Sequence, residues 1–293
     1  MDVVETLAAL ETWRAATTGS LGLVPTMGAL HEGHLSLVER ARIECERVAV
    51  SIFVNPTQFG PNEDFDRYPR DLASDLALLE RQGATMVFTP TAALVYPPGF
   101  STWVTVEGLS DRWEGASRPG HFRGVATVVL KLLNLVRPTR AYFGEKDYQQ
   151  LRVIERMVRE LNVPTRIVPC ATVREADGLA MSSRNVNLSP EDRRAAAVLF
   201  RSLRLAQTEV AGGERDATTL RMIVEKSIAA EPRARIDYVA VADPRGLEPI
   251  GRLEDGGAVC CVAAWVGGVR LIDNMLLVPS GPGPARRSPS HQS

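Results

Sequence analysis

Residues 21–34 read LGLVPTMGALHEGH, and this stretch decides the fold. It opens with a short apolar run at 21–24, continues through a proline and a glycine-containing loop, and ends on two histidines. Leu35, Val38 and Cys45 then follow at helical spacing, which is typical of a helix with one buried face. The stretch therefore predicts a strand, a loop and a helix in succession.

The same alternation repeats along the first 175 residues. Residues 48–54 are a nearly continuous β-branched and aromatic run, as expected of a parallel strand that is covered on both faces. Further strands are expected at 85–88, 141–143 and 165–168, and further helices around 72–79, 125–135 and 151–161. We therefore predict a doubly wound, Rossmann-like α/β fold with a parallel sheet in residues 1–175.

The pattern changes after residue 175 to two helices followed by strands. Ser189 as N-cap and Pro190 as the first helical residue mark the start of this region's first helix. Strands are expected at 236–241, 258–265 and 269–272. Residues 176–280 should form a second, smaller α+β domain that closes as a lid, and residues 281–293, rich in Pro, Gly, Ser and Arg, a disordered tail.

Composition argues against large charged partners. The 34 Lys and Arg residues almost balance the 35 Asp and Glu residues, so no nucleic acid is expected as a partner. The most apolar run, 125–136, is broken by Lys131 and Asn134 and is shorter than the roughly 20 residues that cross a bilayer, so no membrane is expected either. No signal-peptide pattern and no C-x-x-C spacing are present, which predicts a reduced, cytoplasmic location.

Two histidines lie in the loop after the first predicted strand, and a third lies in GASRPGHFRG, residues 115–124. In an open α/β sheet, loops at the carboxyl ends of the strands form the ligand crevice. Gly28 and Gly33 let the backbone approach a ligand closely, and the start of the following helix attracts anions. The loop therefore predicts a phosphate site at which His31 and His34 donate hydrogen bonds.

Other interpretations of this loop fit less well. The two histidines are separated by two residues, whereas a helical zinc-protease pair requires H-E-x-x-H. A P-loop requires G-x-x-x-x-G-K-[ST], which the sequence lacks. A glycine-rich turn before a helix is by itself only a weak signal. We therefore expect a phosphate site of another kind, with no metal held by the protein.

The four residues HEGH, 31–34, resemble the H-x-G-H signature of the nucleotidyltransferase superfamily. In the class I aminoacyl-tRNA synthetase branch this signature is paired with a K-M-S-K-S motif. The counterpart here, at 180–185, reads AMSSRN. Ala180 replaces the leading lysine of the synthetase pattern, which argues against a tRNA synthetase.

A closer resemblance covers almost the whole chain. FVNPTQF at 53–59 and GEKDYQQ at 144–150, together with 25–34, 115–124 and 181–185, resemble the pantothenate synthetase (pantoate:β-alanine ligase) family. The resemblance implies ATP-dependent condensation of (R)-pantoate with β-alanine through an enzyme-bound pantoyl-adenylate. The products would be pantothenate, a precursor of coenzyme A, with AMP and pyrophosphate. It also implies Mg²⁺ with the nucleotide and a homodimer.

The resemblance also assigns roles to residues. ATP contacts are expected from Met27, Gly28, His31, His34, Gly144, Lys146, Asp147, Val173, Met181, Ser182, Ser183 and Arg184. Pantoate contacts are expected from Asn55, Gln58, Arg123 and Gln150. Catalysis is expected from His31, His34, Lys146 and Arg184, which would stabilise charge on the phosphates. Tyr68, Asp75 and Tyr142 are assigned only packing or solubility.

Two other functions fit parts of the pattern. A nucleotidyltransferase that moves AMP onto a phosphate acceptor would share the H-x-G-H turn, but AMP would stay on its acceptor instead of being released. A non-catalytic nucleotide-binding module would need only the phosphate site, and Gln58 and Gln150 would have no function in it. Taken singly, Gln58 also fits a turn residue, Gln150 a solvated helix position and Lys146 an exposed lysine.

Overall fold

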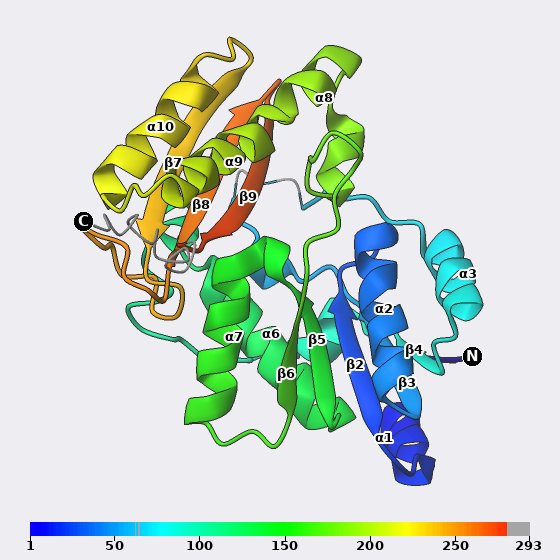
Figure 1. Cartoon of the computed structure of the whole chain (residues 1–293). Coiled ribbons are helices and arrows are strands. Elements are labelled where there is room, and N and C mark those ends of the chain that lie inside the picture. Colours follow the sequence, from blue (N-terminus) through cyan, green and yellow to red (C-terminus); the bar gives the residue numbers. More distant parts are fainter. Residues whose placement is uncertain (62, 64, 280–293) are drawn as a thin grey trace, which may run out of the picture.

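The computed structural model describes residues 1–61, 63 and 65–279, and these residues form two sheets (Figure 1). The larger sheet has six parallel strands in the order β1-β4-β3-β2-β5-β6. Its strands are β1 (Asp2–Val4), β2 (Leu21–Thr26), β3 (Arg47–Ile52), β4 (Met86–Phe88), β5 (Arg140–Gly144) and β6 (Arg166–Cys170). The predicted doubly wound parallel sheet is therefore confirmed.

Helices cover both faces of this sheet. The helices and 3-10 turns of the region are α1 (Leu7–Ala16), α2 (Glu32–Glu44), η1 (Pro56–Gln58), α3 (Leu72–Gln82), α4 (Ala92–Val95), α5 (Glu114–Ser117), α6 (His121–Val136), η2 (Glu145–Asp147) and α7 (Tyr148–Glu160). In Figure 1, α2 and α3 lie on one side of the strands, and α6 and α7 lie on the other.

The continuous apolar runs of the strands follow from this two-sided cover. Leu21 and Leu23 of β2 belong to the core under α1, α6 and α7, whereas Val24 belongs to the core under α2 with Leu35 and Val38. Alternate residues of a strand point to opposite faces. Every position of β2 therefore meets an apolar layer, and no polar alternation is left in the sequence.

The sheet has a switch point between β2 and β5. From β2 the chain continues to β3 on one side, and it later returns to place β5 on the other side of β2. At such a point the loops that leave the two neighbouring strands diverge and open a crevice at the carboxyl edge. The loop after β2 and the turn after β5 are thus neighbours in space.

The second sheet is antiparallel, with the order β7-β8-β9. This region contains η3 (Ser183–Asn187), α8 (Pro190–Ala196), α9 (Val198–Ala211), α10 (Ala217–Ala229), β7 (Ala234–Ala242), β8 (Ala258–Val266) and β9 (Val269–Leu277). Cys260 packs in the core under α9 and α10, and Cys261 packs toward the large sheet. These two adjacent residues of β8 therefore point to opposite faces of the sheet.

Some elements differ from the predicted ranges. The helix expected from residue 125 begins at His121, and β9 extends to Leu277 rather than ending at 272. Within the described residues, no helix has both the length and the apolar character needed to cross a membrane. The predicted tail, 281–293, lies outside the described residues. A domain boundary at residue 175 stays a prediction.

Candidate active site

A cavity of about 220 Å³ opens at the carboxyl edge of the large sheet, beside β2 and β5. Six segments and Tyr68 line it: the loop after β2, η1, Arg118 with α6, the turn after β5, the segment after β6, and η3 with the residues before it. The predicted site residues among its lining are Met27, His31, His34, Asn55, Gln58, Gly144, Lys146, Asp147, Gln150, Val173, Met181, Ser182, Ser183 and Arg184. The structure therefore brings most of the predicted set together, and Gly28 and Arg123 are not in the lining.

His31 and His34 form the N-terminal cap of α2. The Nδ1 atom of His31 accepts a hydrogen bond from the Gly33 backbone N–H at 3.1 Å, and Nδ1 of His34 accepts one from the His31 N–H at 3.4 Å. A neutral imidazole that accepts at Nδ1 carries its proton on Nε2. Each ring therefore has an N–H left to donate.

Burial keeps both rings neutral. It lowers the pKa of His31 to about 4, with the Lys146 charge adding to the effect. It also lowers the pKa of His34 to about 3, with His31 as the next cause. At neutral pH, the two imidazoles are thus hydrogen-bond donors without charge. The sequence predicted two donors at this helix N-terminus, and the structure adds that both are neutral.

A buried carboxylate shapes the loop that precedes the histidines. Asp75 of α3 is 3% exposed and accepts hydrogen bonds from the backbone N–H groups of Ala29 (2.9 Å) and Leu30 (2.8 Å). Gly28 has φ +80°, and a Cβ there would lie 2.9 Å from Asp75 Oδ2. Gly28 therefore serves the loop's conformation and not the cavity lining. The structure gives Asp75 a specific role where the sequence indicated only packing or solubility.

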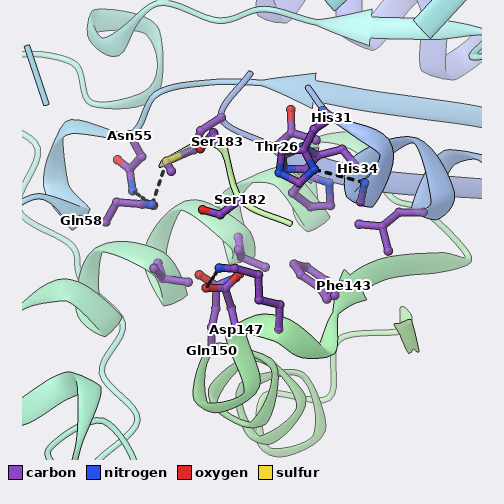
Figure 2. Close-up of a pocket in the computed structure, with 18 of the residues that line it drawn as sticks. Thr26, His31, His34, Asn55, Gln58, Phe143, Asp147, Gln150, Ser182 and Ser183 are labelled. Carbon is purple, nitrogen blue, oxygen red and sulfur yellow. Dashed lines mark hydrogen bonds and ion pairs between the residues drawn. The ribbon is translucent and has the colours of Figure 1, made fainter. Parts of the chain in front are cut away.

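The opposite wall carries the pocket's lysine. Lys146 lies in η2, directly after β5, and its Nζ is 3.6 Å from Asp147 Oδ1. Figure 2 shows His31 and His34 on one side of the cavity and Asp147 and Gln150 on the other. The two walls come from the two strands that flank the switch point, so a ligand between them would contact both loops.

Amide side chains form a third wall. Asn55 and Gln58 are 1% and 9% exposed, and Asn55 Nδ2 donates to Gln58 Oε1 at 3.1 Å and to the Gly124 carbonyl at 3.2 Å. Gln58 Nε2 donates to the sulfur of Met27 at 2.9 Å (Figure 2). A thioether is a weak acceptor. The Gln58 amide can therefore exchange it for a ligand oxygen at little cost.

The segment 181–184 closes the cavity from the side of the small sheet. The Met181 N–H donates to the Val173 carbonyl at 3.0 Å, which ties this segment to the exit of β6. Ser182 is the N-cap of η3 and accepts from the Arg184 N–H at 3.2 Å. Tyr68 Oη is 3.3 Å from Ser183 Oγ, and Tyr68 lines the cavity although its predicted role was only packing or solubility.

Arg123 does not line this cavity. It is exposed, and its guanidinium lies 4.4 Å from the centroid of the Trp103 ring. The physical reason is helical phase, because α6 buries His121, Phe122 and Gly124 and turns Arg123 outward. The contact of Arg123 with pantoate stays a prediction.

Two other side chains of the same segment lie at the cavity. Arg118 donates to the Gln58 carbonyl at 3.1 Å, and Nδ1 of His121 is 2.8 Å from the same oxygen. Arg118 is also paired with Glu63 at 2.5 Å. The sequence of this segment contains no signal that distinguishes Arg118 from Arg123.

Similarity to known proteins is extensive. The sequence profile of the family described as Pantoate-beta-alanine ligase matches residues 2–276. The chain belongs to the pantoate-β-alanine ligase family. Pantothenate synthetase from Chloroflexus aurantiacus (strain ATCC 29366 / DSM 635 / J-10-fl) is 57% identical over 281 residues, which cover 96% of this chain and 100% of that relative. That of Moorella thermoacetica is 55% identical, with 94% and 99% covered.

Solved structures of pantoate-β-alanine ligases show the same fold. Pantothenate synthetase from Thermus thermophilus aligns with a TM-score of 0.90 at 53% identity, covering 95% of this chain and 100% of that one. A ligase from Francisella tularensis, complexed with β,γ-ATP and β-alanine, aligns with a TM-score of 0.77 at 35% identity, covering 94% and 97%. The recognition of this family from five sequence segments is thereby confirmed.

Proposed function

We propose that this ligase condenses pantoate with β-alanine in two steps at the cavity beside β2 and β5, with residue roles as follows. The observation that carries this assignment is the arrangement at the switch point, where two neutral imidazoles lie across the cavity from Asp147 (Figure 2), Lys146 lines the same cavity, and amides line the adjoining wall. Such a site offers hydrogen-bond donors and a positive charge to phosphates, and uncharged groups to a hydroxy acid.

In the first step, the pantoate carboxylate attacks the α-phosphorus of ATP and pyrophosphate leaves. The Nε2–H groups of His31 and His34 donate to phosphate oxygens, while Lys146 and Arg184 supply positive charge. The bound geometry aligns carboxylate and phosphorus, so no protein nucleophile is needed. Met27, Gly144, Asp147, Val173 and 181–183 complete the nucleotide contacts.

Pantoate binds against the amides. Asn55, Gln58 and Gln150 line the same cavity as the histidines, and uncharged amides suit the acid's hydroxyls and carboxylate. Asn55 already donates to Gln58 and the Gly124 carbonyl, so it would orient Gln58 for the acid. The hydrogen bond from Gln58 Nε2 to Met27 sulfur supports this assignment, since binding would replace a weak acceptor with an oxygen. A carboxylate bound to Gln58 would lie close to the nucleotide loop.

In the second step, the β-alanine amine attacks the acyl carbon of the adenylate and AMP leaves. The amine must attack as the free base. His31 and His34 present N–H groups to the cavity, and their Nδ1 atoms accept backbone bonds. These two rings therefore act as donors to the phosphate and not as acceptors of the amine's proton.

Mg²⁺ fits this site as a companion of the nucleotide. Among residues 1–61, 63 and 65–279, no cluster of three His, Cys, Asp or Glu side chains could hold a metal by itself. Asp147 is the one carboxylate in the cavity lining formed by these residues. Asp147 and the phosphates would hold the ion, which would supply charge neutralisation when bound.

We also propose that residues 1–175 and 176–280 are two domains, and that 181–184 covers the phosphates to exclude water from the adenylate. Compaction on adding ATP and pantoate, measured by small-angle scattering, tests this closure. A homodimer through the N-terminal domain, tested by sedimentation, follows from the family resemblance. Four buried free thiols support a reducing cytoplasm as its location.

The test of the function is a coupled assay for AMP with purified protein, ATP, pantoate and β-alanine, omitting each substrate in turn. We expect free AMP and an amide only when all three are present, with pyrophosphate formed continuously only under the same condition. An enzyme that transfers AMP to an acceptor would release no free AMP, and a binding module would consume no nucleotide. Either result would contradict the proposal.

A further inference from the structure

One side chain of the small sheet is bonded to the turn that carries Lys146. Asn274 lies on β9 and is 8% exposed. Its Nδ2 donates to the backbone carbonyl oxygens of Glu145 and Lys146, each at 2.9 Å. An amide nitrogen has two N–H groups, so both are used on two consecutive carbonyls of η2. The turn is therefore held from outside its own domain.

The neighbouring residue of β9 holds a second wall of the cavity. Asp273, with a side chain 1% exposed, accepts from the Arg174 guanidinium at 2.7 and 2.9 Å. Arg174 follows Val173, which lines the cavity, and it also donates to the Asn274 carbonyl at 3.3 Å. Two adjacent residues of β9 are thus bonded to the turn after β5 and to the segment after β6.

The turn that carries Lys146 is loosely packed where it begins. It is only three residues long, and a Cβ added at the preceding Gly144 would meet no heavy atom within 4 Å. A lysine side chain has a flexible four-carbon stem and no preferred direction of its own. The direction of the ammonium group therefore depends on how firmly the backbone of Lys146 is held.

We propose that Asn274 is a positioning residue of the ligase reaction, because its amide holds η2 so that the Lys146 ammonium faces the phosphates of ATP. This inference rests on the proposed function, since it requires Lys146 to act on the nucleotide. Asn274 does not line the cavity beside β2 and β5, but it lines a smaller one of about 40 Å³ next to it, together with Lys146 and Asp147. Its loss is expected to act through Lys146, and a double-mutant cycle separates that effect from a direct contact of Asn274 with a ligand.

The test is a double-mutant cycle on the full chain with Asn274→Leu and Lys146→Ala. Leucine has the branched shape of asparagine, although it is larger, and it removes both donors. We expect Asn274→Leu to lower kcat for pantoate-dependent AMP formation roughly 10-fold or more, because small misplacements of a catalytic charge are costly. The KM for pantoate should change little. In the Lys146→Ala background, Asn274→Leu should have no further effect on kcat.

Two further variants separate positioning from general damage. Gln207→Leu is the matched control, because the Gln207 amide bonds both backbone groups of Val278 at 3.2 and 3.1 Å, just beyond β9 and away from the cavity; its kcat should be unchanged. Asn274→Asp keeps the shape of the side chain and loses the donors, so it should lower kcat even if the leucine variant folds poorly.

Equal losses from Asn274→Leu in the native and Lys146→Ala backgrounds would overturn the inference, as would a normal kcat in both Asn274 variants. Failure of the proposed function is a different result. In that case the unsubstituted chain itself would release no AMP from ATP, pantoate and β-alanine.

Discussion

At the scale of residues, the site depends on groups whose protonation is fixed by neighbours. Backbone N–H groups occupy Nδ1 of both His31 and His34, and burial disfavours the charged form of each ring. Asp147 faces them across the cavity in Figure 2, and its neighbour Lys146 also lines the cavity. Neutral donors together with cations suit a polyphosphate, because Lys146 and Arg184 would supply the charge and the imidazoles would add hydrogen bonds.

Replacing Lys146 tests whether its positive charge is needed in addition to the hydrogen bonds from the two histidines. We expect Lys146→Ala to lower kcat about 100-fold or more, the usual scale for removal of one preorganised charge donor. Steady-state assays of AMP release measure it. Lys131→Ala is the control, since Lys131 lies over the Phe100 ring, 4.7 Å from its centroid and outside the cavity lining. A rate for Lys146→Ala close to that of the control would remove Lys146 from the mechanism.

The pH behaviour of the two histidines gives a second residue-scale prediction. Their folded pKa values of about 4 and about 3 lie below the unfolded value of 6.5, so neither ring should titrate between pH 8 and 5.5. As pH falls below 6.5, the unfolded chain binds protons at these two side chains before the folded chain does. The stability that the neutral rings allow is therefore present above pH 6.5, and the free energy of unfolding falls as the pH drops toward 4. Histidine NMR shifts across this range measure it, and a midpoint near 6.5 for either ring would contradict it.

At the scale of elements, the histidine loop and its strand could be predicted because residues 21–24 are an apolar run that leads into a glycine-containing turn. The β9 extension could not, because Asp273 and Asn274 interrupt the apolar pattern and are satisfied only by partners on distant segments. Asp75 was missed for the same reason. The outward direction of Arg123 depends on where α6 begins, which the sequence placed four residues too late.

The contact between α6 and η1 supports an element-scale prediction. An added Cβ at Gly124 would overlap the Thr57 carbonyl oxygen and lie 2.8 Å from the Gln58 N–H nitrogen. We expect Gly124→Ala to push η1 away, raise the KM for pantoate, and destabilise the fold by about 1–3 kcal/mol through overpacking. Gly251→Ala, with no heavy atom near its added Cβ, is the control. Equal pantoate KM values in the two variants would refute the contact's role.

At the scale of the whole molecule, one face of the small sheet packs into the main core. Ala240, Val259 and Cys261 pack in the same apolar cluster as α6 and α7. Arg270 of β9 makes a bidentate ion pair with Glu114 of α5 at 2.7 and 2.8 Å, and Glu114 has a side chain only 8% exposed. The two sheets could be predicted separately, but these contacts between distant segments left no pattern in the sequence.

Removing Arg270 tests the importance of this connection. Arg270→Met would leave the Glu114 carboxylate buried without its main partner, so we expect the free energy of unfolding to fall by about 3 kcal/mol. Urea denaturation measures it. Arg221→Met is the control, because Arg221 forms an exposed pair with Glu225 at 3.8 Å, and such pairs contribute about 0–1 kcal/mol. Equal small losses in both variants would contradict the structural role of the Arg270 pair.

The central claim is that separate loops meet at the β2 and β5 edge to hold a triphosphate beside a carboxylate. Isotope exchange between pyrophosphate and ATP tests it most directly, because exchange requires reversible formation of the acyl-adenylate. We predict exchange when pantoate is present, without any β-alanine, and its loss in Lys146→Ala. Exchange that is absent with pantoate, or that proceeds equally well without it, would contradict the account.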